Sequence, residues 1–585
     1  MIEFEKLKQE ISEMLPVSKE LSSDQNLISA GINSLMVMRF VSRLRKEGIK
    51  ISYGDLLEEP TLTAWYKLIV QAAEKKDKKK KVRSAKKSES SSSSQKSFPL
   101  TDIQYAYKIG REDGRELGGV GCHAFMEFSG KGIDAEKLDA AWKKVQYHHP
   151  MLRARFLDNG EQEIMDKPFS EHIDIIDLSN ENDWEKKCTA IGEKLTHRKF
   201  EVEKGHVCAF TLVKAPDNEY RLFYDVDLLV ADVQSFNIIL RDLAAAYKGR
   251  ELPEDSLNWD FAAYLENKKS QEAEDEAAAK EYWSRRINDI ALAPELPLAK
   301  EPSEIKTTRT ERHIVNISMD TWNKALAMAA KYNITPAIYL MTVYAMIIGK
   351  WSSSKRFLIN IPTFDRRTEY GASENAVADF TTLMLLEADL TNDPSFEELA
   401  LQIKKRLGED MKYTSYSGVR VQRDIISKYG EVKNAAPVVF ACNFGNDIIG
   451  GETEEVFGKF ERMLSQTPGV WIDFQSYETQ DRIMLSWDTV VGLFPDGVIN
   501  DMMSSMEQLI INTSENEWNQ HFDLLPPEQR RFVEEQKNIV IPEVQSRLFD
   551  GFMSSAEKFP DKTAIIDTGA GISLSYKELK EKALS

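Results

Sequence analysis

Cysteine is scarce in this chain. Its four cysteines, Cys122, Cys188, Cys208 and Cys442, are widely scattered, form no C-x-x-C pair and have no histidines at a metal-ligand spacing. This pattern argues against a disulfide scaffold and against zinc, so we expect no metal, and it fits a reducing compartment. The chain also lacks an apolar run of about 18 residues, and its N-terminus is charged, so neither a membrane span nor a signal peptide is predicted. We therefore expect a soluble, cytoplasmic protein.

Basic residues are concentrated in one segment although the net charge is −18. Residues 75–97 carry ten Lys and Arg against two acidic residues, and five consecutive serines occupy positions 90–94. The segment has no interleaved aromatics, so it predicts a solvated flexible linker, with no nucleic-acid or membrane partner. A chain of 585 residues is too long for one core, and about two to four domains are expected.

The first 74 residues predict a bundle of four short helices. Residues 4–14 read as an amphipathic helix, and a last helix is expected after Pro60-Thr61. Between them, apolar residues recur at helical spacing and Gly48 follows as a stop; the apolar residues are Val37, Phe40, Val41 and Leu44. A carrier domain has this layout.

Ser34 follows Gly31 at the predicted start of the second main helix. Free amides and the positive end of the helix dipole would favour a phosphodiester on its hydroxyl. The alternative is that Ser34 only caps the helix, as serine often does. Spacing alone leaves both interpretations open.

The surrounding residues resemble the aryl carrier domains that open yersiniabactin- and pyochelin-type nonribosomal peptide synthetases. The resemblance runs through residues 26–28, 31–34, 38–39 and 55–65. It implies 4'-phosphopantetheine on Ser34, attached by a phosphopantetheinyl transferase. Because no adenylation domain precedes the carrier, a stand-alone aryl-AMP ligase is expected to supply an aryl acid of the salicylate or dihydroxybenzoate type. The family usually has aspartate where Asn33 stands.

Two carboxylates, Asp227 and Asp232, stand in a D-x-x-x-x-D-x-x-S pattern that ends at Ser235. An alternating strand precedes them and a helix is predicted from about residue 232, so they lie at a strand-to-helix turn. They could take part in chemistry directly. Alternatively, Asp232 caps its helix while Asp227 pairs with an arginine such as Arg153 or Arg155.

A histidine pair, His148-His149, invites a catalytic interpretation. An H-H-x-x-x-D site would need aspartate at position 153, which is Arg153. We therefore expect a structural role for both histidines, and amide formation by the usual condensation motif is disfavoured.

The acidic pattern resembles that of heterocyclization domains, which have it in place of the condensation motif H-H-x-x-x-D-G. Five further motifs agree in order, and they lie at residues 357–367, 378–381, 437–440, 465–475 and 486–488. The resemblance implies a multidomain α/β protein in which the carrier precedes two chloramphenicol-acetyltransferase-like lobes in a V, with the reaction between them. We expect the carrier at 1–74, the linker at 75–97 and heterocyclization at 98–530, with lobes of about 98–288 and 300–530.

The resemblance also implies the catalytic residues. In the family, an aspartate that corresponds to Asp473 serves in cyclodehydration, hydrogen-bonded to a threonine, but Ala441 occupies the threonine position here. Either Thr467 or Gln475 compensates, or the ring closes poorly. The complete predicted set of catalytic residues is Asp473, Asp227, Asp232, Asn360, Gln475 and Thr467.

We expect an aryl group carried on Ser34 to be condensed with Cys, Ser or Thr on a downstream aminoacyl carrier domain and closed to a thiazoline or oxazoline. Condensation without efficient ring closure, which Ala441 favours, and a degenerate carrier-docking module are the alternatives. Residues 531–585 resemble the start of an adenylation domain. They end before any glycine-rich phosphate loop, so we expect a truncated domain there.

Overall fold

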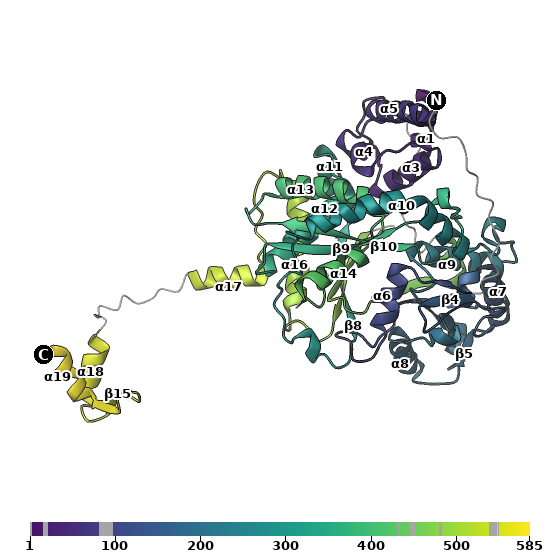
Figure 1. Cartoon of the computed structure of the whole chain (residues 1–585). Coiled ribbons are helices and arrows are strands. Elements are labelled where there is room, and N and C mark those ends of the chain that lie inside the picture. Colours follow the sequence, from purple (N-terminus) through teal and green to yellow (C-terminus); the bar gives the residue numbers. More distant parts are fainter. Residues whose placement is uncertain are drawn as a thin grey trace. The chain divides into compact units, whose positions relative to one another are not determined.

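The computed structural model describes residues 3–15, 21–80, 97–430, 432–444, 451–478, 482–537, 547 and 549–585. They form two compact units, Met1–Pro526 and Pro527–Ser585. Residues 81–96 of the expected basic linker lie outside the described residues. Figure 1 shows the first unit as a small helical domain beside a large α/β domain.

The N-terminal domain is built from helices around one apolar core. The helices are α1 (Phe4–Met14), α2 (Leu27–Ala30), α3 (Ser34–Lys46), α4 (Tyr53–Glu58) and α5 (Leu62–Lys80). Phe40 stacks on Trp65 with ring centroids 5.3 Å apart. The predicted helical bundle is confirmed, with the short α2 in addition. Helix α5 continues six residues into the expected linker, because lysine and alanine are good helix formers.

The first lobe of the large domain has two sheets. Its strands are β1 (Ser97–Pro99), β2 (His123–Lys131), β3 (Ala154–Phe156), β4 (Glu161–Ile164), β5 (Asp174–Asp177), β6 (Cys208–Lys214) and β7 (Glu219–Asp227). Its helices are α6 (Asp102–Gly110), α7 (Ala135–His148), α8 (Trp184–Thr196) and α9 (Val233–Tyr247), and α10 (Phe261–Arg286) leads into the second lobe. The small sheet has the order β1-β4-β3.

The second lobe is built on a six-stranded sheet. The strands of this sheet are β8 (Thr310–Ser318), β9 (Arg356–Phe364), β10 (Thr381–Asp389), β11 (Val438–Cys442), β13 (Ile472–Glu478) and β14 (Arg482–Val490). Strand β12 (Lys459–Gln466) lies in the same part of the sequence but outside this sheet. Its helices are α11 (Met319–Lys331), α12 (Pro336–Trp351), α13 (Phe396–Asp410), α14 (Gly418–Tyr429), α15 (Gly451–Phe457) and α16 (Val498–Glu515). The six-stranded sheet has the order β10-β9-β11-β13-β14-β8.

One strand joins the two lobes. β12 follows the second lobe's α15 in sequence but pairs with β2, which gives the first lobe a five-stranded sheet of order β12-β2-β7-β6-β5. The chain then returns to the second lobe at β13. The lobes therefore share backbone hydrogen bonds, and the predicted two-lobed α/β fold is confirmed.

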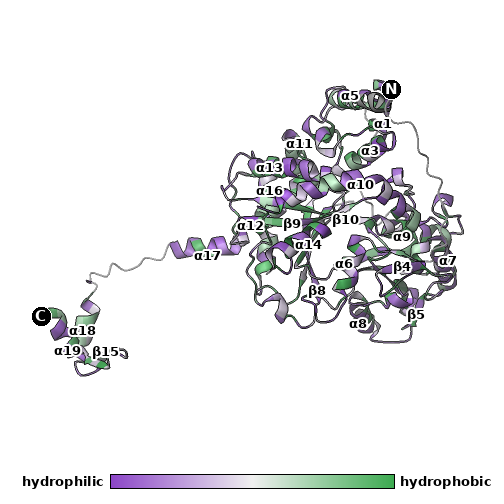
Figure 2. Ribbon diagram, in the orientation of Figure 1, coloured by the Kyte–Doolittle hydropathy of each residue, from purple (hydrophilic) through white to green (hydrophobic). Residues whose placement is uncertain are grey.

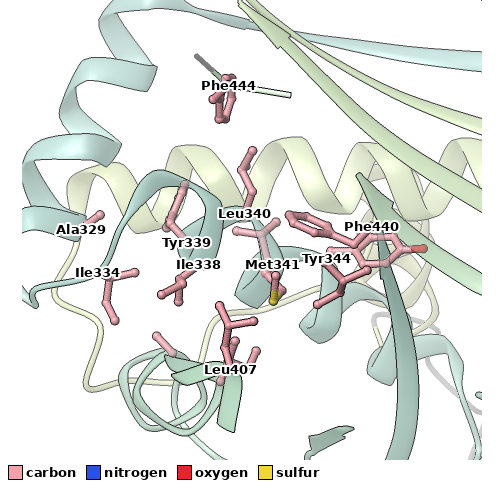
Figure 3. Close-up of a cluster of buried hydrophobic side chains, with 14 of the residues drawn as sticks. Ala329, Ile334, Ile338, Tyr339, Leu340, Met341, Tyr344, Leu407, Phe440 and Phe444 are labelled. Carbon is pink, nitrogen blue, oxygen red and sulfur yellow. The ribbon is translucent and has the colours of Figure 1, made fainter. Parts of the chain in front are cut away.

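Helix α12 forms the centre of the second lobe's core. Twelve of its residues, from Ile338 to Gly349, are buried without interruption. Figure 3 shows Ile338, Tyr339 and Met341 of this helix close to Leu407 and Phe440. Figure 2 shows that hydrophilic residues predominate instead on helix α10, and also on α17 (Pro527–Lys537) of the second unit.

In the described ranges no single helix is long and apolar enough to cross a membrane. Helices α11 and α12 reach that length and composition only as a pair, bent by 100° at the turn between them.

The second unit, Pro527–Ser585, contains a two-stranded antiparallel sheet. Besides α17 its elements are α18 (Asp550–Lys558), β15 (Thr563–Asp567), β16 (Ile572–Ser575) and α19 (Tyr576–Leu584). The side chain of Ser575 caps α19. The start of an adenylation domain remains a prediction for this unit.

Candidate functional site

Polar residues form a row across the six-stranded sheet. Asp473 of β13 lies between Val439 of β11 and Asp488 of β14. The row continues to Asn360 of β9 beyond Val439, and to Arg312 of β8 beyond Asp488. Residues directly opposite each other on neighbouring strands point to the same face. The fold therefore brings Asn360 and Asp473, both predicted site residues, onto one face.

Asp473 is a buried carboxyl group that, in the described part of the chain, accepts no hydrogen bond from a cationic side chain. It is 8% exposed, and its Oδ2 accepts a hydrogen bond of 3.0 Å from Gln475 Nε2. Among the described residues, nothing hydrogen-bonds to its Oδ1. Burial, and next the charge of Asp488, raise the pKa of Asp473 to about 7. Near neutral pH this group can both donate and accept a proton.

The orientation of the Gln475 amide follows from its other contacts. Its Oε1 accepts hydrogen bonds from Arg312 Nη2 at 3.2 Å and from the hydroxyl of Tyr477. Because both partners are donors, the amide nitrogen must face Asp473. Arg312 is itself fixed by Asp488, through bonds of 2.7 and 2.6 Å. A chain of hydrogen bonds therefore leads from this ion pair through Gln475 to Asp473.

Ala441 lies directly beside Gln475, on the neighbouring strand β11. Its methyl group offers no hydrogen-bond donor to Asp473. Of the two donors expected to compensate, Gln475 contacts Asp473. The hydroxyl of Thr467 instead lies 3.5 Å from the sulfur of Cys122.

Asp227 ends β7 and is completely buried. It forms an ion pair with Arg111 and accepts a hydrogen bond of 3.1 Å from the amide of Leu229. The structural alternative predicted an arginine partner, but Arg153 and Arg155 were the wrong candidates. Arg153 donates to backbone carbonyl groups and Arg155 to a neighbouring glutamate, because both belong to the small sheet region.

Asp232 caps helix α9 and connects the two lobes. Its Oδ1 accepts a bond of 2.7 Å from the amide of Ser235 and lies 3.2 Å from Arg366 Nη2 of the second lobe. Arg366 also lies over the ring of Phe380, 4.1 Å from its centroid. The predicted helix cap is therefore present, and its arginine partner comes from the other lobe.

Asp379 is a buried carboxyl group that our sequence analysis did not select. Its Oδ1 accepts a hydrogen bond of 3.0 Å from the amide of Thr381, and within the part of the chain that the structure covers its Oδ2 has no partner. Burial is the main cause that raises the pKa of Asp379 to about 8. Asp379 and Asp473 both act electrostatically on Tyr107 and Cys122, so all four groups are close together. Its place in the motif at residues 378–381 was the available signal.

Each histidine of the pair at the end of α7 lies within hydrogen-bonding distance of a neighbouring polar group. His149 Nε2 lies 2.8 Å from Asp242 Oδ2, and His148 Nε2 lies 2.9 Å from the hydroxyl of Ser256. Ligand atoms of the two histidines and Asp242 come within 4.8 Å of one another. Arg241 already forms an ion pair with Asp242. These contacts agree with the structural role expected for both histidines.

Ser34 starts α3, after a turn in which Gly31 adopts φ 114°. Asn33 caps this helix by accepting a bond of 3.0 Å from the amide of Met36, so it keeps the capping function of an aspartate. The hydroxyl of Ser34 accepts a hydrogen bond of 2.9 Å from Tyr53 and lies 2.8 Å from the hydroxyl of Thr335, the cap of α12. The serine therefore faces the second lobe.

A cavity of about 760 Å³ opens at Ser34. It reaches from the helical domain to the end of β9 and to β11, and its lining includes Arg39, Pro336, Ile361, Phe440 and Cys442. A serine hydroxyl at the rim, positive charge beside it and an apolar interior fit a phosphopantetheine arm, whose phosphodiester is anionic. The residues present therefore fit the expected group.

A helical carrier whose first-turn serine faces a cavity of a two-lobed α/β domain defines a carrier-dependent acyl-transfer protein. Residues 122–524 match the family described as condensation domain, and residues 5–69 match the phosphopantetheine attachment site family. The chain belongs to the condensation-domain family and has an N-terminal phosphopantetheine carrier domain. The predicted prosthetic group is thereby confirmed at the level of the domain.

Two relatives match almost the whole chain. Pyochelin synthetase PchE of Pseudomonas aeruginosa is 33% identical over 591 residues, which cover 99% of this chain and 40% of that protein. Phenyloxazoline synthase MbtB of Mycolicibacterium paratuberculosis is 31% identical over 593 residues, which cover 99% of this chain and 50% of that protein. The chain therefore spans half or less of the length of these relatives.

Solved structures agree with the sequence relatives. A cyclization-docking bidomain of the EpoB nonribosomal peptide synthetase from Sorangium cellulosum matches with a TM-score of 0.68 and 27% identity, over 78% of this chain and 94% of that chain. The nonribosomal peptide synthetase FmoA3 in its AMPPNP-bound form matches with a TM-score of 0.68 and 25% identity, over 83% of this chain and 50% of that chain. The predicted resemblance to siderophore-type nonribosomal peptide synthetases with a cyclization domain is confirmed.

Proposed function

We propose that this chain is an entry module that joins an aryl group, carried on Ser34, to a Cys, Ser or Thr residue on a downstream aminoacyl carrier domain, and closes the product to a thiazoline or oxazoline. A stand-alone aryl-AMP ligase would supply the aryl group. The names of the two relatives, a pyochelin synthetase and a phenyloxazoline synthase, support this substrate class.

The observation that carries the proposal is the state of Asp473. Within the described residues Asp473 is buried and forms no ion pair, and its pKa is raised to about 7, so it can donate and accept protons near neutral pH. Gln475 holds it by a hydrogen bond of 3.0 Å.

Ring closure requires three proton transfers. The side-chain thiol or hydroxyl of the acceptor adds to the amide carbonyl carbon, and its proton passes to the former carbonyl oxygen, which becomes a hydroxyl group. This hydroxyl group then leaves as water, and the ring nitrogen loses its proton. Neutral Asp473 donates a proton to the departing oxygen, and the resulting carboxylate takes the proton of the nitrogen. The carboxyl group is thereby regenerated, and the net change is the loss of one water.

The phosphopantetheine arm would supply a thioester, which activates the aryl group for transfer to the acceptor amine. The chain's own part is to hold Ser34 at the cavity rim, through Tyr53 and Thr335. Arg39 and Arg366 line the same cavity and place positive charge near the phosphodiester.

Ala441 supports a second candidate, condensation without efficient ring closure. A hydrogen bond to a charged group contributes about 1.5–3 kcal/mol, and the residue at position 441 cannot donate one. Gln475 donates one such bond to Asp473 Oδ2, whereas Oδ1 has no hydrogen-bond partner among the described residues.

Reconstitution tests these candidates. The chain is loaded by a promiscuous phosphopantetheinyl transferase and an aryl ligase, mixed with a cysteinyl carrier, and the intact mass of the product on that carrier is measured. The proposal expects the amide mass less one water. The amide mass alone supports the second candidate, and an unchanged cysteinyl carrier indicates a module that only docks. Ser34→Ala is the control, and it must prevent loading.

A further inference from the structure

Two glycines stand within helices where glycine is unfavourable. Gly54 is the second residue of α4 in the carrier domain, and Gly408 lies near the end of α13 in the second lobe. Glycine in a helix interior is about 1 kcal/mol less favourable than alanine. Neither glycine has a positive φ, so backbone conformation does not require it at either position.

These two glycines touch each other. A Cβ on Gly54 would lie 3.0 Å from the Cα of Gly408 and 3.1 Å from its carbonyl oxygen. A Cβ on Gly408 would lie 3.1 Å from the Cα of Gly54, and among the described residues outside its own helix it would meet no other atom within 4 Å. Both obstacles are backbone atoms, which cannot rotate away as a side chain does. A side chain at position 408 would therefore meet the carrier first.

The contact lies beside the residues that position Ser34. Tyr53, the neighbour of Gly54, donates the hydrogen bond to Ser34, and Leu407, the neighbour of Gly408, lines the same cavity. Figure 3 shows Leu407 close to the side chains of α12, and the cap of that helix, Thr335, meets Ser34. A shift of α4 at Gly54 would therefore act directly on the contacts that position Ser34.

The polar contacts around the glycines are weak by comparison. Lys412 lies 3.4 Å from Asp55, and Lys50 lies 3.4 Å from Asp275. The Lys50 and Asp275 side chains are 81% and 57% exposed, and exposed pairs contribute about 0–1 kcal/mol. The close backbone approach is thus a stricter geometric requirement than these two ion pairs.

We propose that the contact between Gly54 and Gly408, called the steric key below, determines which carrier domain can dock on the second lobe. The surface of α13 accepts this chain's own carrier domain because that carrier has no side chain at position 54, and it rejects a carrier with any larger residue there. The proposal rests on the assignment of Ser34 as the attachment site, and it adds the residues that select which carrier presents its cargo to the cavity.

The test is a cross-link that needs neither prosthetic group nor substrate. Lys50→Cys and Asp275→Cys are introduced together in the full chain, treated with a short bis-maleimide, and the cross-linked peptides are quantified by mass spectrometry. Adding Gly408→Ala should lower the yield by about tenfold or more, as expected from overpacking. The melting temperature should not fall, because alanine is the better helix residue. The matched control is Gly451→Ala in α15, whose added Cβ meets no described atom within 4 Å.

An unchanged yield in Gly408→Ala overturns the proposal. If Gly408→Ala unfolds the second lobe, Gly54→Ala on the carrier decides: the same loss supports the key, and an unchanged yield refutes it. Loss of product formation while the cross-link persists would count against the proposed function and leave the key intact.

Discussion

The buried carboxyl groups at the acidic turn and the buried carboxyl group of Asp473 have different partners. Asp227 and Asp232 at the strand-to-helix turn of the first lobe are each paired with an arginine, Arg111 and Arg366. Asp473 of the second lobe forms no ion pair among the described residues, although it accepts a hydrogen bond from Gln475, and burial raises its pKa to about 7. The hydrogen bonds of Gln475 and Ser465 and the charge of Arg312 oppose this rise. Burial raises the pKa of Asp227 as well, and there the directly paired Arg111 is the main opposing group.

The comparison separates structural carboxylates from reactive ones. An arginine holds a carboxylate in its charged form and uses its oxygens for geometry. A carboxyl group buried without one can change its protonation near neutral pH. The contacts of the acidic turn therefore support a structural role for Asp227 and Asp232, whereas those of Asp473 support its proposed role as the acid of ring closure.

The largest effect is expected for Asp473→Asn. Asparagine has the same shape but cannot exchange the proton, so ring closure should slow by about 10²–10⁴-fold, the usual contribution of acid–base catalysis. The ratio of heterocycle to linear amide, measured by single-turnover mass spectrometry, reports the change. Ring closure at the wild-type rate would show that Asp473 does not exchange the proton and would remove the proposed difference between it and the arginine-paired carboxylates.

Asp232→Asn should act on stability instead. Breaking one partner of a buried ion pair destabilises by about 3–5 kcal/mol, because Arg366 is left without its counter-charge. Denaturant unfolding measures the loss, and the product ratio of the folded protein should stay unchanged. The double variant Asp232→Asn with Arg366→Met should recover much of the stability. A changed product ratio with unchanged stability would show that Asp232 takes part in the chemistry.

The sequence allowed the carrier domain, the order of the lobes and most of the site to be predicted. The motif at residues 465–475 led to Asp473 and Gln475, because it resembles the corresponding motif of heterocyclization domains. The partners of the acidic turn could not be found in this way. Arg111 and Arg366 lie 116 and 134 residues from Asp227 and Asp232, and only the packing of the lobes brings them together.

Asp379 was missed for a different reason. Its motif was recognised, but its protonation depends on burial and on carboxylates from other segments, none of which a local pattern reveals. The contact between Gly54 and Gly408 is similar, since each glycine by itself looks like an ordinary exposed helix position.

Asp379 should give stability a pH dependence. Its pKa is about 8 in the folded protein against 3.8 for the ordinary group, so between these values the folded state holds a proton that the unfolded state has released. Its contribution to stability is therefore fully present below about pH 4 and is lost as the pH rises through about 8, with a slope of at most about 1.4 kcal/mol per pH unit. Asp379→Asn should flatten the unfolding free energy between about pH 5 and pH 8. The exposed Asp158→Asn is the control, and an equal slope in wild type and Asp379→Asn would contradict the assignment.

The smallest and most specific change is expected for Ala441→Thr. Position 441 lies beside Gln475 on the neighbouring strand, and Asp473 Oδ1 has no hydrogen-bond partner in the described structure. A threonine hydroxyl at this position would add a second donor to the carboxylate, in a bond that contributes about 1.5–3 kcal/mol when well aligned. We expect several-fold more heterocycle relative to linear amide in the mass-spectrometric assay, with total acyl transfer unchanged. Ala441→Val, which has the same shape without the hydroxyl, is the matched control. If both variants raise the ratio equally, packing and not hydrogen bonding limits ring closure, and Gln475 already supplies all the polarity that Asp473 requires.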